Sequence, residues 1–272
     1  TYRPHHSHNM NPFEKIYNLT SLLKGDILDD INPLEDVKKV LAGKKILVLG
    51  DEIGTLSQVL NNFGAEAYGI EYDPRVVALA HSGILAENLV PQTQVIEGNL
   101  WKLGDRESEL YKQISEKGPF DAVFSSAVFN DGSGFPEGAY DKYSGKYPRY
   151  FEEKNRGEFI SQEAWQAGAN WDRFMVSLAS LVKPSGLNIH QHVEFHTMHG
   201  SVVMRELSKK LEELSKSENE NVRQYALNEL KKMQKYSENY ASSGDENIFV
   251  ERGNMLVHFE QELEKLERDN IL

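Results

Sequence analysis

The sequence predicts an α/β protein with a mostly parallel β-sheet that is covered by helices on both faces. Short apolar runs of strand length alternate with helix-like segments between residues 45 and 125, a rhythm typical of parallel strands joined by crossover helices. The first apolar run ends in a glycine-containing turn at residues 50–54, and the second ends in acidic residues. Two such strand ends are typical of a nucleotide-type cofactor site.

The expected elements follow one another in a regular order. Residues 12–42 are predicted to be helical, because apolar residues recur at helical spacing and Pro33 opens a segment with acids in its first turn. Buried strands are predicted at residues 46–49, 65–71, 94–97, 120–125 and 187–193. Helices are expected at residues 55–63, 74–80 and 106–115, with a further one that includes Trp171.

Three later segments depart from this alternation. Residues 128–160 are rich in Gly, Tyr and Pro and predict a long loop, which would lie over the carboxyl ends of the strands as a lid or as an insertion without substrate contact. Residues 202–240 are expected to be helical and too long for one ordinary helix, so we predict two. Residues 247–251 and 255–260 flank Gly253-Asn254 and predict a β-hairpin.

The composition limits the classes of function. The formal net charge is −12, and such an acidic chain repels the phosphate backbones of nucleic acids. The absence of cysteine excludes disulfides, thiolate metal sites and a cysteine nucleophile. No apolar run approaches the length of a membrane span, and no signal peptide is recognised. We therefore expect a cytoplasmic protein that acts on a small molecule, with neither nucleic acid nor membrane as a partner.

The first two strand ends carry the residues expected of a cofactor site. Gly50 and Gly54 bound the first turn, with Glu52 between them. A turn of this kind brings the backbone close to a ligand. Glu71 ends the second strand and could accept hydrogen bonds from both hydroxyls of a ribose. The segment Asp73-Pro74 follows it and marks the start of the next helix.

Two further motifs make the pattern more specific. The third strand runs into Glu97-Gly98-Asn99-Leu100, and Leu181-Val182-Lys183-Pro184-Ser185-Gly186 precedes the fifth. Taken in order, these motifs resemble those of the class I S-adenosylmethionine-dependent methyltransferases. In that family an acid after the third strand accepts from the adenine amino group, and the carbonyl of Asn99 can accept the same bond. Glu52 replaces the middle glycine of the family's turn.

The resemblance implies the fold, the domain limits and the cofactor. The fold would be a Rossmann-like methyltransferase sandwich with a mostly parallel seven-stranded sheet, closed by the C-terminal antiparallel hairpin. This domain would span residues 44–262, after a helical extension at 1–43 and before a tail at 263–272. The implied cofactor is S-adenosyl-L-methionine, and its expected binding residues are Gly50, Asp51, Glu52, Gly54, Glu71, Tyr72, Asn99, Leu100 and Ser125.

The acceptor side is predicted from residues after the fourth and fifth strands. The fourth strand lacks the Asn/Asp-Pro-Pro-Tyr/Phe pattern of enzymes that methylate exocyclic or amide nitrogens. The candidate catalytic residues for O- or N-methylation of a small molecule are His192, His196 and Asp131. A histidine could be the general base, because its pKa lies near neutrality. These histidines could instead bind a metal together with Glu194, or be ordinary strand and loop residues; we predict a site without a metal.

Other functions remain open on the same fold. Asp73-Pro74-Arg75-Val76 is similar to a segment of spermidine-synthase-like relatives and allows aminopropyl or aminocarboxypropyl transfer, although no catalytic acid is evident at Ser125-Ser126. The substituted turn also allows a non-catalytic S-adenosylmethionine-binding protein. A dinucleotide-binding domain would need a second glycine where Glu52 stands. The helical segment at 202–240 could form a homo-oligomer surface, a cap or a solvated insertion.

Overall fold

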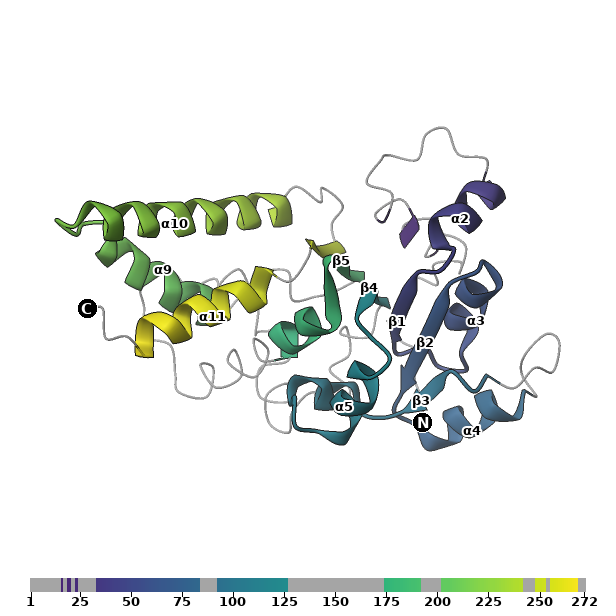
Figure 1. The fold of residues 1–272 in the computed structure, drawn as a ribbon. Helices are drawn as coiled ribbons and strands as arrows, with labels where there is room; N and C mark the ends of the chain where they lie inside the picture. Colours follow the sequence, from purple (N-terminus) through teal and green to yellow (C-terminus); the bar gives the residue numbers. More distant parts are fainter. Residues whose placement is uncertain are drawn as a thin grey trace.

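A computed structural model gives the chain one six-stranded sheet in the order β3-β2-β1-β4-β5-β6 (Figure 1). The strands are β1 (Lys45–Leu49), β2 (Glu66–Glu71), β3 (Val95–Glu97), β4 (Phe120–Ser126), β5 (Val182–Gln191) and β6 (Ile248–Arg252). Strands β1 to β5 are parallel, whereas β6 is antiparallel to β5. The structure describes residues 16, 19, 20, 23, 33–83, 92–126, 174–191, 202–241, 248–252 and 255–268.

The five parallel strands confirm the α/β prediction and the Rossmann-like fold. The predicted hairpin and seventh strand are wrong, because in the described part of the chain the segment after β6 is the helix α11 (Met255–Arg268). Leu256, Phe259 and Leu266 of this segment are all buried, and their spacing lies on one face of a helix. The helical period of these side chains therefore outweighs the turn signal of the preceding Gly-Asn pair.

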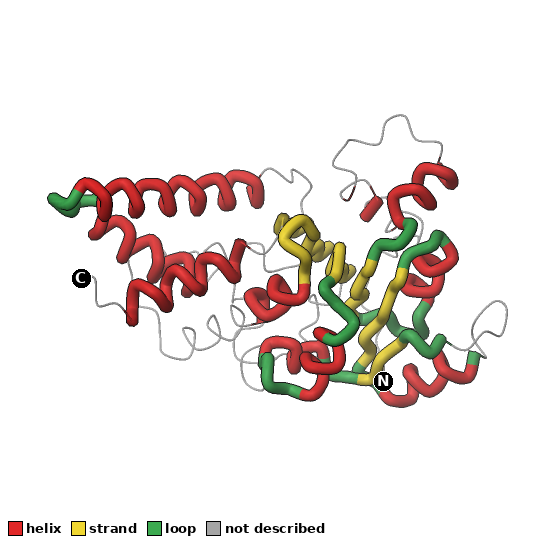
Figure 2. Tube along the Cα trace, in the orientation of Figure 1, coloured by secondary structure: helices red, strands yellow, loops and turns green. Residues whose placement is uncertain are grey.

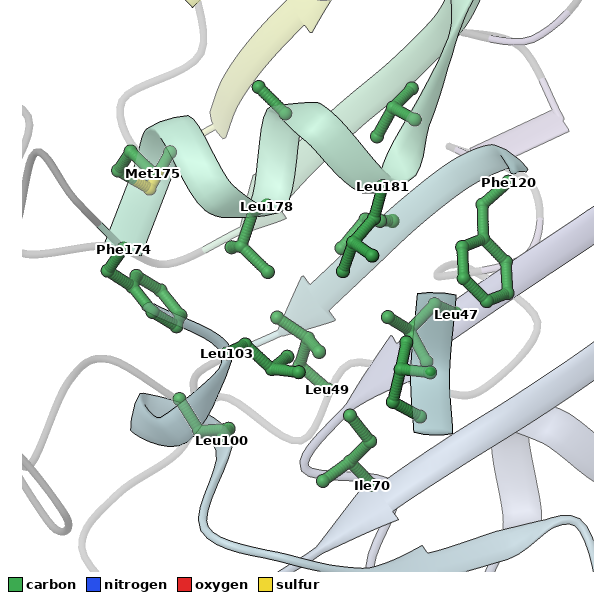
Figure 3. Close-up of a cluster of buried hydrophobic side chains, with 14 of the residues drawn as sticks. Leu47, Leu49, Ile70, Leu100, Leu103, Phe120, Phe174, Met175, Leu178 and Leu181 are labelled. Atoms are coloured by element: carbon green, nitrogen blue, oxygen red, sulfur yellow. The ribbon is translucent and has the colours of Figure 1, made fainter. Parts of the chain in front are cut away.

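Helices cover both faces of the sheet because alternate residues of each strand point to opposite sides. On one face, Ile46 and Val48 pack with α2 (Pro33–Leu41) and α3 (Thr55–Asn62). On the other, Leu47 and Leu49 pack with α5 (Glu109–Ser115) and a helix at residues 174–181 (Figure 3). Helix α4 (Pro74–Ser82) lies against β3, and a short 3-10 helix, η1 (Leu100–Gly104), follows that strand.

The predicted turn before the fifth strand lies inside β5 as an irregularity. Phe120 of β4 pairs with Val182, but two residues later Ala122 pairs with Leu187, so β5 contains extra residues here. Pro184 within this stretch has no N–H to donate to a ladder. Gly186 approaches β4 so closely that an added Cβ would lie 2.8 Å from the Asp121 carbonyl oxygen. The sequence pattern therefore marks a break in the ladder, as expected, without ending the strand.

The C-terminal helices form a unit with its own hydrophobic cluster. Helices α9 (Val202–Leu214), α10 (Glu220–Ala241) and α11 pack on one another around Leu211, Ala226 and Phe259. Figure 2 shows them together at one end of the molecule. The two helices predicted at residues 202–240 are thereby confirmed. Polar contacts also join α10 to α11, where Glu229 accepts a hydrogen bond from His258 (2.8 Å).

The ends of the predicted domain can be placed only in part. Ile16 and Leu19 of the N-terminal extension are buried in the cluster beneath α2. The expected boundary at residue 262 falls inside α11. The loop expected at residues 128–160 lies outside the described residues. Among the helices that the structure describes, none has the length and apolar content needed to cross a membrane.

Candidate functional site

The candidate site lies at the carboxyl edge of the sheet, where the chain reverses its direction of winding. From β1 the chain continues to β2 and β3 on one side, and then returns to β4 and β5 on the other. Leu49 at the end of β1 pairs with Ile70 of β2 and with Ser125 of β4. The crevice beyond such a switch point is where open α/β sheets bind ligands. The predicted cofactor residues follow these strand ends.

The first turn keeps a glycine-like backbone at all three expected positions. The φ angles are 69° at Gly50, 52° at Glu52 and 82° at Gly54. Glu52 is the one non-glycine residue with a positive φ in the part of the chain that is described. A side chain in this conformation costs roughly 1–2 kcal/mol, so the rest of the turn must hold it. The substitution of the middle glycine has therefore left the backbone conformation intact, with the glutamate side chain exposed.

Asp51 points inward and caps helix α3. Its Oδ1 accepts hydrogen bonds from the backbone N–H groups of Leu56 (3.1 Å) and Ser57 (3.3 Å), which the N-cap residue Gly54 cannot satisfy with a side chain. Only 5% of Asp51 is exposed, and its Oδ2 is buried without a hydrogen-bond partner among the described residues. Burial raises the pKa of this carboxyl to about 7, against the lowering effect of its hydrogen bonds.

The carboxylate of Asp51 has room only because of a glycine on the neighbouring strand. A Cβ added to Gly69 of β2 would collide with Oδ2 of Asp51. Gly69 lies beside Val48 in the register of β1 and β2, one residue before Ile70. The sequence predicted Asp51 as a cofactor-binding residue. In the structure its side chain accepts hydrogen bonds from the first turn of α3.

Glu71 is held in place with one oxygen to spare. Its Oε1 accepts from the backbone N–H groups of Tyr72 (2.9 Å) and Asp73 (3.0 Å), and its Oε2 bonds no described residue. The Glu71 carbonyl accepts from Gly98 N (2.9 Å), which ties the ends of β2 and β3 together. Two backbone donors fix the carboxylate orientation without neutralising its charge. The remaining oxygen is available for a hydroxyl group of a ligand.

Tyr72 follows Glu71 at the end of β2, and Asn99 follows the neighbouring strand β3. Tyr72 is 63% exposed, unusual for so large an aromatic residue. Asn99 is also exposed. Its backbone carbonyl accepts a hydrogen bond from Lys102 N at the start of η1. Leu100, predicted as a cofactor residue, is instead buried in the core cluster of Figure 3. The structure therefore brings together Glu71, Tyr72 and Asn99 at adjacent strand ends and places Leu100 beneath them.

Ser125 forms a buried link between β4 and β5. Its hydroxyl lies 2.7 Å from Nδ1 of His190, its register partner on β5. Both side chains are almost completely buried. Burial lowers the pKa of His190 to about 3, so the imidazole is neutral at physiological pH. His190 lies two residues before the predicted acceptor-side residue His192, but its partnership with Ser125 depends on strand register, which no local pattern reveals.

The acceptor side stays a prediction. Asp131, His192 and His196 lie outside the described residues. Among the described residues, no group of three or more histidine, aspartate or glutamate side chains is arranged to hold a metal ion.

Comparisons with known proteins were made by sequence and by structure. No family model matches the sequence, and no curated protein matches it. A solved structure from Staphylococcus aureus, assigned as a caffeoyl-CoA O-methyltransferase, is 17% identical with a TM-score of 0.35, and the match covers 91% of this chain and 95% of that one.

Two other solved structures match at similar scores. Magnesium protoporphyrin IX methyltransferase from Synechocystis PCC 6803, with bound S-adenosylmethionine, is 18% identical with a TM-score of 0.33, over 66% of this chain and 57% of that one. DesVI from Streptomyces venezuelae is 11% identical with a TM-score of 0.37, over 68% of this chain and 52% of that one. The chain thus spans just over half the length of these two. The likeness to all three structures is low.

Proposed function

We propose that this protein binds S-adenosyl-L-methionine at the carboxyl edge of its sheet and transfers the methyl group to an oxygen or nitrogen of a small molecule. The observation that carries the proposal is Glu71. Glu71 is 8% exposed as a residue. Two backbone N–H groups orient its carboxylate, and no described residue donates a hydrogen bond to the second carboxylate oxygen. A carboxylate held in this way suits the vicinal hydroxyls of a ribose.

The residues around Glu71 fit the rest of an adenosyl group. The exposed ring of Tyr72 offers a surface on which a planar base can stack. Asn99 offers an amide that can accept from an exocyclic amino group. The turn from Gly50 to Gly54 lets the backbone approach the remainder of the ligand closely. These contributions come from three neighbouring strand ends, so one ligand can meet all of them.

The bound cofactor supplies a methyl group on a positively charged sulfur. The chain's part is to hold the acceptor in line with that methyl group and to exclude water, and positioning of this kind can supply most of the acceleration. His192, His196 and Asp131 are the proposed acceptor-side residues, with a histidine as the base that takes the acceptor's proton. His190 is excluded from that role, because its lowered pKa makes it a poor proton acceptor near neutrality.

The segment that resembles spermidine-synthase-like relatives has a structural role here. Asp73 caps α4 by accepting from Arg75 N (2.9 Å), and Pro74 is the first residue of that helix. Asp73 and Arg75 also form an exposed ion pair. These contacts are accounted for by helix formation alone, so they do not favour aminopropyl transfer over methyl transfer.

Calorimetric titration with S-adenosylmethionine and with S-adenosylhomocysteine tests the proposal. Glu71→Gln keeps an oxygen that can accept from the two backbone N–H groups but removes the charge. We expect it to weaken binding by tenfold or more, since a hydrogen bond to a charged group contributes about 1.5–3 kcal/mol. Glu97→Gln is the matched control, because Glu97 pairs with Glu71 in the β2–β3 register and is exposed.

Three results would count against the proposal in different ways. Wild-type protein that binds neither compound would contradict the function itself. Binding that Glu71→Gln leaves unchanged would contradict the placement of the ribose. Binding without transfer of labelled methyl groups to any small molecule of a cell extract would favour a non-catalytic S-adenosylmethionine-binding protein.

A further inference from the structure

Helix α3 presents the kind of N-terminus that binds phosphate in dinucleotide-binding folds. It follows the glycine turn of β1 directly and begins at Thr55. In such folds the backbone N–H groups of the first turn point at the ligand, and the helix dipole favours a negative charge there. The same groups would be available for the pyrophosphate of a dinucleotide if nothing else occupied them.

In this protein the chain's own carboxylate occupies that place. Asp51 Oδ1 accepts from both Leu56 N and Ser57 N. The carboxylate is enclosed by the turn, by the first turn of α3 and by Gly69 of β2. Its second oxygen is buried and has no hydrogen-bond partner in the described part of the chain, so the two backbone N–H groups at Oδ1 compensate its charge only in part.

We propose that Asp51 is a specificity-determining residue that excludes phosphate-bearing nucleotides from the cofactor site and so restricts it to adenosyl compounds without phosphate groups. The inference rests on the proposed function, because it concerns the same site. A phosphate brought to the start of α3 would meet a helix terminus whose donors are already used. It would also meet the like charge of the ionised Asp51 carboxylate at close range, which disfavours its binding.

The tests compare adenosine with NAD⁺, an adenine dinucleotide whose pyrophosphate keeps its charge across the pH range used. Wild-type protein is expected to bind adenosine and S-adenosylhomocysteine and to bind NAD⁺ at least tenfold more weakly than adenosine. Asp51→Ser removes the charge and clears the N-terminus of α3. We expect it to lower the ratio of the NAD⁺ to the adenosine dissociation constant by tenfold or more. Asp51→Asn, which can still accept from both N–H groups, should lower the ratio less.

Asp73→Ser is the matched control. Asp73 is also an aspartate that caps a helix at the same edge of the sheet, but the helix is α4 and the residue pairs with Arg75. The Asp73→Ser variant should leave the ratio of the NAD⁺ to the adenosine dissociation constant unchanged. Circular dichroism and thermal unfolding show whether each variant is folded, so a loss of all binding through unfolding is distinguished from a change in selectivity.

A measurement on the wild-type protein alone covers the case in which both Asp51 variants unfold. The charged group that acts on the Asp51 carboxyl is Glu52, while α3 and β2 face it with Leu56, Ser57 and Gly69. Below its pKa of about 7 the carboxyl is neutral. The ratio of the NAD⁺ to the adenosine dissociation constant should therefore be smaller at low pH than at high pH.

The outcomes separate the two proposals. If wild-type protein binds NAD⁺ as tightly as adenosine, the exclusion by Asp51 is refuted even when S-adenosylmethionine binds. If Asp51→Ser is folded and keeps the wild-type ratio, it is refuted as well. If the wild type binds no adenosyl compound, the proposed function fails, whereas NAD⁺ binding gained by Asp51→Ser would still support the role of Asp51.

Discussion

Two buried ionisable groups at the carboxyl edge, Asp51 and His190, should make stability depend on pH in opposite directions. For Asp51 the pKa rises from 3.8 to about 7 on folding, so the native state binds its proton more tightly than the unfolded state does. The stability that this contributes is present below pH 3.8 and is lost as pH rises through about 7. For His190 the pKa falls from 6.5 to about 3. Its contribution is present above pH 6.5 and is lost as pH falls through about 3.

The magnitudes are similar because both groups shift by a similar amount. One pH unit inside either window is worth about 1.4 kcal/mol of unfolding free energy, so each full window amounts to about 5 kcal/mol at most. Between the unfolded pKa of Asp51, 3.8, and that of His190, 6.5, the two slopes oppose each other. The wild-type protein should therefore show less pH dependence in this range than either group alone would produce.

Single substitutions should uncover each slope. In Asp51→Asn the free energy of unfolding, measured relative to wild type by urea denaturation, should rise by about 1.4 kcal/mol per pH unit from pH ~4 to pH ~7. In His190→Asn, which can still bond Ser125, the same difference should fall as pH rises toward the unfolded pKa of the histidine, 6.5. Taking differences removes the contribution of the other titrating groups. A flat difference curve for either variant would refute the reasoning for that residue.

Two further predictions concern the packing of the turn. Glu52→Gly should be more stable than Glu52→Ala by about 1 kcal/mol, because only glycine adopts a positive φ without strain; equal urea midpoints would contradict a left-handed residue at position 52. Gly69→Ala should lower stability by roughly 1–3 kcal/mol, the usual cost of overpacking, because its Cβ would collide with the Asp51 carboxylate. The loss should be smaller in an Asp51→Gly background, which removes the clashing Cβ together with the carboxylate, and an equal loss in both backgrounds would exclude Asp51 as the cause.

The five parallel strands could be predicted from the sequence because they rest on strong local signals. The five parallel strands are apolar runs bounded by turn residues, and their alternation with helices leaves few topologies. The end of the chain was harder, since Leu256-Val257-His258-Phe259 is short enough to suit a strand or a helix. What decides between them is the burial of Phe259 and Leu266 against α9 and α10, a long-range contact that the sequence does not display.

The site shows the same division between local and long-range causes. Glu71 was predicted as a ligand because its place at a strand end is a local feature, and the structure leaves one of its oxygens available. Asp51 and Glu52 could not be told apart in the sequence, because the backbone path around the turn decides which carboxylate points inward. Ser125 and Leu100 were predicted as cofactor-binding residues, and in the structure strand register and core packing bury both of them.

The antiparallel strand β6 also protects the sheet from self-association. Its five residues pair with Leu187 to Gln191 of β5, whose N–H and C=O groups would otherwise form an open edge. Exposed strand edges rich in apolar residues recruit other chains, and Leu187 and Ile189 of β5 are of this kind. Because β6 follows about 60 residues after β5 in the chain, that edge stays open during synthesis until α9, α10 and β6 itself have been made. Variants that loosen α10 or α11 should therefore aggregate before the parallel strands unfold.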